Sequence, residues 1–438
     1  MSTGALSALP RPVPLSPPPS APSLLRPTRQ PRGWRQFDPM PAPGEPRTRH
    51  RPRAAHRRRL AALAVLAATA LGIGLAVGCA GGGGKSLSPG DVVRAQREAQ
   101  PVRFTVEASG DLLIHSPVWE RALVLGGGQY DFAPLFTEIK PYVARADLAL
   151  CHVETPMTPA APASYPIFNT PPELAKGIKA TGWDACDTAS NHSLDQTQTG
   201  IDDTGEALDH AGVEHTGSFP SPAAQRKPVI VDVHGVKVAF LAYTTDTNGI
   251  PSPHTWSVNI ASPDAVLADA RRAHKLGADA VIVNLHWGGE IVPEYQSEPS
   301  PGQLSLAKKL TASSLITAIV GQGPHAVQPI ERINDKFVVF SEGNLISNQS
   351  PEAGLPASSQ DGLIALLDCV AKGGHVRVRD VSYVPVFVNH PDFEVLPIGD
   401  ALRKGEGDPT LLRGSYGRTV SVIGHGTHIE PLPPKLPG

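Results

Sequence analysis

The segment Trp183–Asp195, WDACDTASNHSLD, runs from an apolar, strand-like half into a polar half that contains Asn191 and His192. Residues typical of turns and helix starts follow, which places this pair at the carboxyl end of a predicted strand. An amide oxygen beside an imidazole suits metal binding and proton transfer. Asn often only begins a turn, however, so the pair predicts a site only if other ligands lie nearby.

Four other apolar segments end in the same manner, with a side chain that can bind a metal. These side chains are Asp111, Glu154, His286 and His325. Each alone has an ordinary structural role, such as capping a turn or carrying a solvated charge. In open α/β sheets, however, ligands bind outside the carboxyl ends of the strands. Five such strand ends predict one site, and carboxylate, amide and imidazole ligands indicate Mn, Fe, Zn or Mg.

Strand and helix patterns alternate along most of the chain, which predicts α/β layers. Predicted strands are Asp147–Val153, Asp184–Ala189, Val229–Val233, Val236–Tyr243, Ala280–Leu285, Ala318–Val320 and Phe337–Phe340, after one that opens at Val102. Predicted helices are Pro172–Thr181, Thr199–Ala211, Pro263–Leu276 and Pro301–Ala312. The hairpin around His234-Gly235 adds an antiparallel pair, so we expect mixed sheets.

The last part of the chain, residues 350–438, has a different pattern. Leu363–Val370 and His375–Val388 are predicted to form two strands of a meander, and a polar tail rich in Pro and Gly follows them. The histidines within Gly424–His428 resemble a metal motif, but the surrounding residues have poor strand character. We therefore predict a loop there.

The first part of the chain has the pattern of an exported or anchored protein. Residues 1–59 are predicted to form a disordered leader rich in Pro and Arg, and residues 60–79 a signal peptide or membrane anchor. The segment resembles a lipobox that ends at Cys79, and residues 80–101 are predicted to form a flexible linker. Either a lipidated Cys79 or an uncleaved spanning helix would hold the folded part at the extracytoplasmic face of the cell membrane.

Charge and cysteine content narrow the possible partners. Residues 1–60 hold 12 Arg and 2 acidic residues, which leaves 27 basic and 39 acidic residues in the remainder. An acidic folded part argues against nucleic acid as a partner. Cys151 and Cys186 lie in apolar strands and are expected to be buried small hydrophobes, or a disulfide if the protein is extracytoplasmic.

The order of the motifs resembles that of the CapA family, the capsule and poly-γ-glutamate synthesis proteins of bacteria, which include PgsA. The motifs that carry the resemblance are Gly110-Asp111, His152–Pro156, Ser190–Asp195, His286–Glu290, Gly323–Glu331 and Ser341–Leu345. It spans Val102 to Gln349, so the CapA-like domain is predicted to occupy residues 102–349. The family is similar to metallophosphoesterases. The resemblance therefore implies a four-layer α/β/β/α sandwich of mixed sheets with a cleft for metal ions.

The resemblance also implies a role for each residue. Asp111 and His325 would hold a first metal, and Glu154 would occupy the position of the acid that bridges the two metals. Asn191 and His286 would hold a second metal, and His192 would protonate the leaving group.

Two positions depart from the metallophosphoesterase pattern. Leu113 stands where a metal-binding histidine is usual, and Gly323 replaces the histidine expected two residues before His325. One or two divalent ions are therefore expected. Gln322, Glu290 or water could stand in for the missing ligand.

The sequence is consistent with two alternative functions. The first is a membrane-anchored, metal-dependent hydrolase of the phosphoesterase type, which acts in the synthesis of a capsule or a poly-γ-glutamate-like surface polymer. The second is a non-catalytic scaffold subunit of a membrane complex that synthesises or exports such a polymer. The ligands that are present favour the hydrolase, whereas Gly323 favours a weakened site.

Overall fold

The computed structural model of the chain describes residues 100–424 and 426–437. The predicted leader, the apolar segment and Cys79 lie outside the described residues. Within the described part, none of the helices combines the length and the apolar character needed to span a bilayer.

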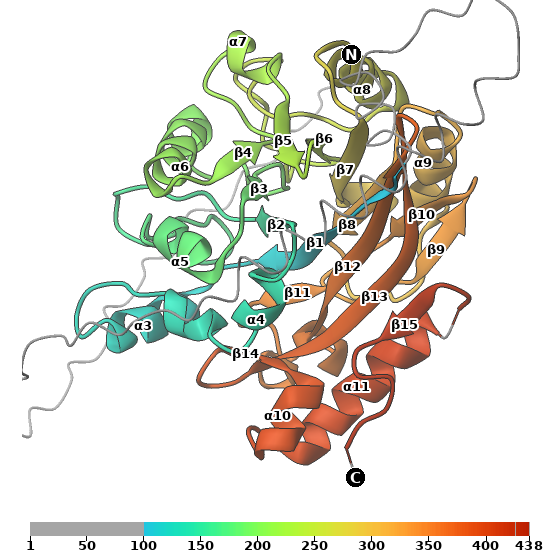
Figure 1. Cartoon of the computed structure of the whole chain (residues 1–438). Helices are drawn as coiled ribbons and strands as arrows, with labels where there is room; N and C mark the ends of the chain where they lie inside the picture. Colours follow the sequence, from blue (N-terminus) through green and yellow to red (C-terminus); the bar gives the residue numbers. More distant parts are fainter. Residues whose placement is uncertain (1–99, 425, 438) are drawn as a thin grey trace, which may run out of the picture. The chain divides into compact units, whose positions relative to one another are not determined.

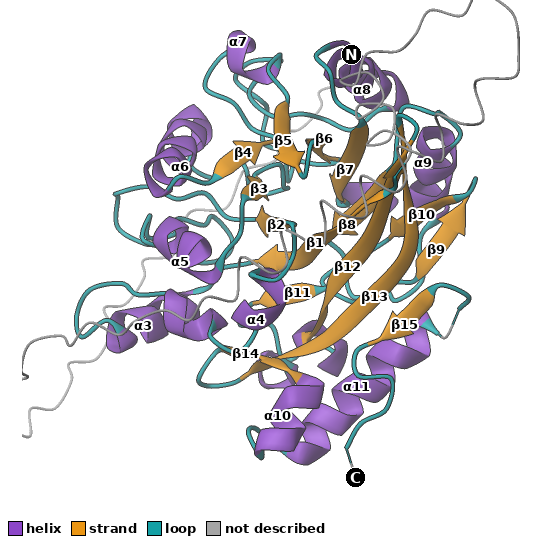
Figure 2. Ribbon diagram, viewed as in Figure 1, coloured by secondary structure: helices purple, strands orange, loops and turns teal. Residues whose placement is uncertain are grey.

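A first sheet of nine strands contains the first four strands of the chain, β11 and the strands after residue 360 (Figures 1 and 2). Its main order is β14-β13-β12-β1-β2-β3-β4, with β11 beside β1 and β15 beside β13. Strands β1 to β4 are parallel, and β12 pairs antiparallel with β1. The bounds are β1 Val102–Leu112, β2 Leu148–Val153, β3 Ala185–Asp187, β4 Glu214–Thr216, β11 Asn344–Ile346, β12 Asp361–Lys372, β13 His375–Asn389, β14 Glu394–Pro397 and β15 Ile429–Pro431.

A second sheet of six strands has the order β5-β6-β7-β8-β10-β9. Strands β6, β7, β8 and β10 run parallel, and the edge strands β5 and β9 are antiparallel to their neighbours. The mixed sheets expected from the hairpin are therefore confirmed. The bounds are β5 Val229–Val233, β6 Val236–Thr244, β7 Ala280–His286, β8 Ala318–Gln322, β9 Ile330–Ile333 and β10 Lys336–Val339.

Alternate residues of the central strands pack into different apolar layers. In β6, Val238 and Phe240 belong to the core between the two sheets, whereas Ala239 and Leu241 pack outward against helices α8 and α9. A third cluster joins the outer face of the first sheet to helices α3, α5 and α6. Strands that are buried on both faces are apolar throughout, because successive side chains point to opposite faces. The three cores confirm the predicted four-layer α/β/β/α sandwich.

The helices lie where the sequence patterns predicted them, with additions. They are α3 Ser116–Leu125, α4 Lys140–Val143, α5 Leu174–Thr181, α6 Thr197–Ala211, α7 Pro222–Gln225, α8 Pro263–Lys275, α9 Pro301–Thr311, α10 Ile398–Lys404 and α11 Pro409–Ile423. Figure 1 shows α5 and α6 on one side of the molecule and α8 and α9 on another. Helix α9 begins with a capping box between Ser300 and Gln303, which satisfies two backbone N–H groups at its start.

The polar carboxyl-terminal tail that we predicted contains two helices instead. Helix α11 starts at Pro409, and the Asp408 side chain caps it by accepting two backbone N–H groups. Leu412 of α11 packs with residues of β13, β14 and α10 in a small separate core. Two glycines inside α11 weaken the helical pattern of the sequence, so this packing, rather than local propensity, stabilises the helix.

Cys151 and Cys186 are register partners on β2 and β3, and they form a disulfide. Their Cα atoms are 4.5 Å apart. The sequence allowed either two unpaired buried cysteines or a disulfide, and the structure contains the disulfide. Cys369 is buried and has no disulfide partner within residues 100–424 and 426–437.

Candidate metal centre

The strand register brings the predicted ligands to one edge of the sandwich. Asp111 of β1 pairs with His152 of β2, which pairs in turn with Asp187 of β3. Gly110 allows β1 to approach the segment after β10, because a Cβ there would lie 2.0 Å from the carbonyl oxygen of Gly343. The Asp111 N–H donates to that same carbonyl at 3.0 Å.

Two sets of three possible ligands share Asp111, and within each set the ligand atoms lie within 4.8 Å of one another. The first set is Asp111, His152 and His286, and the second is Asp111, Glu154 and His325. Asp111 Oδ1 lies 3.6 Å from His152 Nε2 and 3.8 Å from His286 Nδ1. Its Oδ2 lies 3.2 Å from His325 Nδ1, and Glu154 Oε1 lies 3.7 Å from His325 Nε2. All five residues are buried.

Several oxygens of this centre are buried and accept no hydrogen bond from the part of the chain that the structure describes. They are both carboxylate oxygens of Asp111, both of Glu154, and Oδ1 of Asn191. Burying carboxylates without partners is costly, and a bound cation would offset that cost. The donor set of carboxylates and imidazoles matches the preferences of Mn, Fe and Zn. The residues present therefore fit a divalent ion.

Burial and neighbouring charges shift the pKa values of the centre. Burial and the carboxylate of Asp111 raise the pKa of Glu154 to about 7. Burial alone would lower the pKa of His325, but the charges of Glu154 and Asp111 outweigh it and raise the pKa to about 10. Burial and the neighbouring imidazoles hold the pKa of His286 well below its usual range, so His286 is neutral. A neutral imidazole is the form that binds a metal.

His152 is a candidate ligand that was absent from the predicted set. Its Nδ1 lies 3.0 Å from Asp187 Oδ2, while its Nε2 faces the centre. Asp187 is itself fixed, because it accepts the Ala189 N–H at 2.6 Å and also bonds to the Asn284 amide. A histidine backed by a carboxylate is the usual arrangement of a metal-binding imidazole. His152 and Glu154 are two residues apart at a strand end, and this spacing is the sequence signal that could have identified His152.

The departure at Gly323 has a steric reason. Its φ is +106°, and a Cβ there would lie 2.0 Å from the carbonyl oxygen of Trp287. No other residue fits this position. The Gln322 side chain does not substitute, because its amide bonds to Asn284 and Glu342.

At the other departure, Leu113 is buried. The nearby His115 lines the cavity beside the centre and belongs to neither ligand set. Its Nδ1 accepts the Asn348 N–H at 3.2 Å.

A cavity of about 420 Å³ adjoins the centre, and Asn191, His192 and His325 lie in its wall. His192 Nδ1 donates to Asp195 Oδ2 at 2.7 Å, which leaves Nε2 available. The edge of Phe168 packs on the His192 ring at 4.7 Å between centroids. Asn191 Nδ2 donates to Asn248 at 3.3 Å, and the buried Oδ1 of Asn191 has no hydrogen-bond partner among the described residues. The structure thus brings Asp111, Glu154, His286 and His325 into two ligand sets and places Asn191 and His192 beside them.

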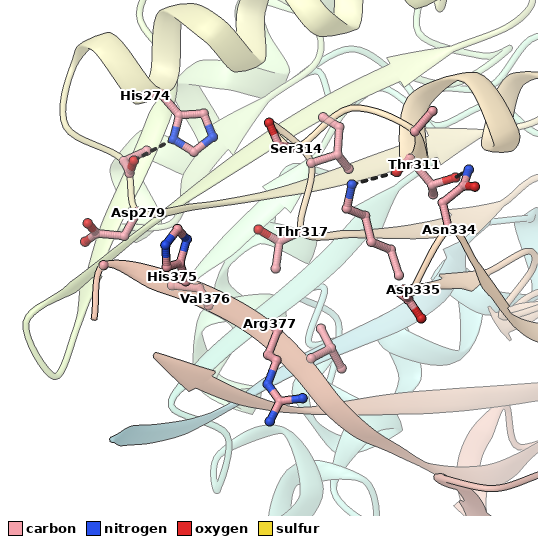
Figure 3. Close-up of a pocket in the computed structure, with 16 residues that line it drawn as sticks. His274, Asp279, Thr311, Ser314, Thr317, Asn334, Asp335, His375, Val376 and Arg377 are labelled. Atoms are coloured by element: carbon pink, nitrogen blue, oxygen red, sulfur yellow. Dashed lines mark hydrogen bonds between the residues drawn. The ribbon is translucent and has the colours of Figure 1, made fainter. Parts of the chain in front are cut away.

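A larger cavity, of about 600 Å³, lies where β7, β8 and β10 begin, at the other ends of these strands (Figure 3). Two of its polar side chains bond to the backbone: the His274 ring nitrogens face the carbonyl oxygens of Ala278 and Leu315, and Lys336 Nζ donates to that of Thr311. It contains neither ligand set. His428, in the turn before β15, contacts Asp380 and likewise belongs to neither set.

Comparison with known proteins shows that the chain is similar to bacterial proteins of capsule synthesis. The chain is 26% identical over 273 residues to the capsule biosynthesis protein CapA of Bacillus anthracis, a match that covers 59% of this chain and 63% of that protein. It is 28% identical over 223 residues to the PGA biosynthesis protein CapA of Bacillus subtilis (strain 168), covering 49% and 57%. The chain thus spans about 60% of the length of these relatives.

Among solved structures, the calcineurin-like phosphoesterase YfkN of Bacillus subtilis is a distant likeness. It is 14% identical with a TM-score of 0.41, and the match covers 74% of this chain and 99% of that one. The family described as bacterial capsule synthesis protein PGA_cap matches residues 105–349, more than half of the chain. This match includes every residue of both ligand sets, and the chain belongs to that family.

Proposed function

We propose that the protein is a metal-dependent hydrolase of the phosphoesterase type that acts in the synthesis of a capsule or a poly-γ-glutamate-like surface polymer. The observation that supports hydrolysis most directly is the group of buried, unpartnered oxygens of Asp111 and Glu154 beside a cavity that holds His192. The polymer is suggested by the relatives, which are named for the synthesis of capsule and PGA.

Asp111, His152 and His286 would hold one ion, and Asp111, Glu154 and His325 a second. The free Oδ1 of Asn191 is a further oxygen donor next to them. A bound divalent ion supplies Lewis acidity toward a phosphoryl oxygen and lowers the pKa of a bound water. Asp187 orients His152 through Nδ1 and keeps Nε2 directed at the centre.

His192 is the proton donor in this proposal. Water forms a bond to phosphorus while the bond to the leaving oxygen breaks and its electron pair stays on that oxygen. His192 Nε2 gives the leaving oxygen a proton, and the proton released by the water restores the imidazole. Asp195 holds Nδ1 at 2.7 Å and so fixes the ring orientation that this transfer needs.

We also propose that the protein is anchored at the extracytoplasmic face of the cell membrane through the segment that ends at Cys79. The Cys151–Cys186 disulfide supports a location outside the cytosol, where such bonds persist. Mass spectrometry of the mature amino terminus tests the anchor. A lipid on Cys79 is expected, and an unmodified Cys79 would remove the lipoprotein proposal.

Metal analysis of the purified full chain tests the centre. We expect at least one Mn, Fe or Zn ion per chain, and much less in Asp111→Asn, because both ligand sets share that carboxylate. His286→Ala disrupts only one set and should retain part of the metal. A wild-type chain that carries no metal above background would contradict the hydrolase.

Replacing His192 tests the chemistry separately. His192→Ala should keep its metal, because the residue belongs to neither ligand set, and should lose about 10²- to 10⁴-fold in kcat on a phosphate ester. Steady-state kinetics on the metal-loaded enzyme measures the loss. An unchanged kcat would exclude His192 as the proton donor.

A scaffold in a membrane synthase or export complex is the second candidate. One observation favours it: His152 Nε2 and His286 Nδ1 lie 3.0 Å apart and bond to each other, an arrangement that needs no ion. If the chain binds no metal but co-purifies with a membrane synthase, the scaffold is correct.

A further inference from the structure

The cavity beside the metal centre carries few charges that could meet a phosphate. Among the described residues, none that lines it is Lys or Arg. Its ionisable side chains are three imidazoles, two tyrosines and the carboxylate of Glu294. An anionic substrate would therefore depend on the ions and on His192 for its neutralisation.

Glu294 is held at this wall by the backbone around it. The N–H of the next residue, Tyr295, donates to the Pro324 carbonyl at 2.7 Å, in the turn that carries His325. Tyr295 has a φ of +61°, an uncommon conformation for a tyrosine that its surroundings must stabilise. The Gln328 side chain donates to the Gln296 carbonyl at 3.0 Å and fixes the loop on its other side. The backbone on the carboxyl-terminal side of Glu294 is therefore fixed along this wall, and the exposed Glu294 side chain lines the cavity.

Aromatic side chains form much of the remaining wall. Phe168 packs edge-on against both His192 and His115, at 4.7 and 5.2 Å between ring centroids. Tyr165 is 76% exposed, and Tyr295 lies 6.2 Å from the His325 ring. Such rings offer flat, largely apolar surfaces for organic groups on both sides of a phosphate.

We propose that this site takes phosphodiesters in preference to phosphomonoesters, an inference that rests on the proposed hydrolase function. A diester carries one negative charge, which the ions and His192 can meet. A monoester carries close to two at neutral pH, because its second pKa is about 6. The second charge would face the Glu294 carboxylate with no Lys or Arg to offset it.

The charge of the monoester product explains why the product leaves the site. Water adds to phosphorus, one ester P–O bond breaks, and the leaving alcohol takes the electron pair with a proton from His192. The new monoester then loses a proton to solvent and gains a second charge. Glu294 repels that charge, so the product leaves rather than being hydrolysed again.

The test compares two substrates of the full chain loaded with Mn²⁺: bis(p-nitrophenyl) phosphate as the diester and p-nitrophenyl phosphate as the monoester. We expect kcat/KM to be at least about tenfold higher for the diester. Glu294→Gln should reduce this ratio by about tenfold, chiefly by raising kcat/KM for the monoester. Glu298→Gln is the matched control, because this exposed acid lies in the same loop but outside the cavity wall.

A monoester hydrolysed as fast as the diester, or a ratio that Glu294→Gln leaves unmoved, would overturn the diester assignment while leaving the hydrolase intact. If the metal-loaded chain hydrolyses neither compound, the proposed function fails and the diester assignment fails with it.

Discussion

Asp187 lies outside both ligand sets, yet it sets the orientation of one of their imidazoles. Its carboxylate accepts from His152 Nδ1 and is itself held by the Ala189 N–H and the Asn284 amide. The chain of hydrogen bonds continues through Gln322 to Glu342. A metal ligand is thereby supported by a buried polar network that joins the two sheets.

Asp187→Asn should lower metal affinity by about 10- to 100-fold, the usual cost of removing such a supporting carboxylate. Competition with a coloured chelator measures the affinity. Asp184→Asn is the control, because this aspartate precedes the same strand but its carboxylate accepts only the Ala149 N–H among the described residues. Equal affinities for the two variants would contradict the role given to Asp187.

The sequence was informative about single residues where the strand-end pattern was simple. Asp111, Glu154, His286 and His325 were predicted from their positions, and the fold places them together. His152 was missed because it lies inside an apolar strand, where a single polar residue does not by itself indicate a metal ligand. The register, which pairs it with Asp111 and Asp187, shows its place, and its spacing of two residues from Glu154 was the available sequence signal.

At the level of elements, the turn after β8 contains a backbone conformation that only glycine can adopt. Gly323 approaches the Trp287 carbonyl, and His325 follows with a φ of +52°. The turn therefore aims the His325 ring while it excludes a side chain two positions earlier. This packing leaves no room for a histidine side chain at position 323.

Gly323→Ala should destabilise the protein by about 3 kcal/mol or more, since it combines a backbone clash with a left-handed φ. Gly374→Ala provides the comparison: its φ is +78° but a Cβ there meets nothing within 4 Å, so a cost of about 1–2 kcal/mol is expected. Denaturant unfolding measures both. Similar losses for the two variants would show that the contact with Trp287 is unimportant.

Elements were predictable where their periodicity was strong and unpredictable where tertiary contacts decide. The central strands and helices α5, α6, α8 and α9 begin or end within about two residues of the predicted positions. Helix α11 was missed, and its support comes from distant residues. Arg418 in α11 pairs with Asp361 of β12, and Leu412 packs against β13 and β14.

For the whole molecule, one buried acid in the first sheet makes folding stability depend on pH. Burial, as the largest cause, raises the pKa of Glu107 from 4.5 to about 8, although Ser109 and the Leu150 N–H oppose the shift. The folded state thus holds a proton that the unfolded state releases near pH 4.5. This contribution to stability is complete below pH 4.5 and is lost as the pH rises through about 8.

Glu107→Gln removes this titration. Between pH 5 and pH 9 the wild type should therefore lose stability relative to the variant, by at most about 5 kcal/mol at about 1.4 kcal/mol per pKa unit. Urea unfolding at several pH values gives the difference directly. A constant difference between the two proteins across this range would mean that Glu107 does not ionise there.

The pairing of β1 with β12 has a consequence for work with shortened versions of this protein. The family match stops at residue 349, but eight register pairs join β1 to a strand that starts at Asp361. A fragment cut at 349 would leave the middle of its main sheet with an open, apolar edge, which invites aggregation. The stretch matched by the family model is thus shorter than the sheet to which its first strand belongs.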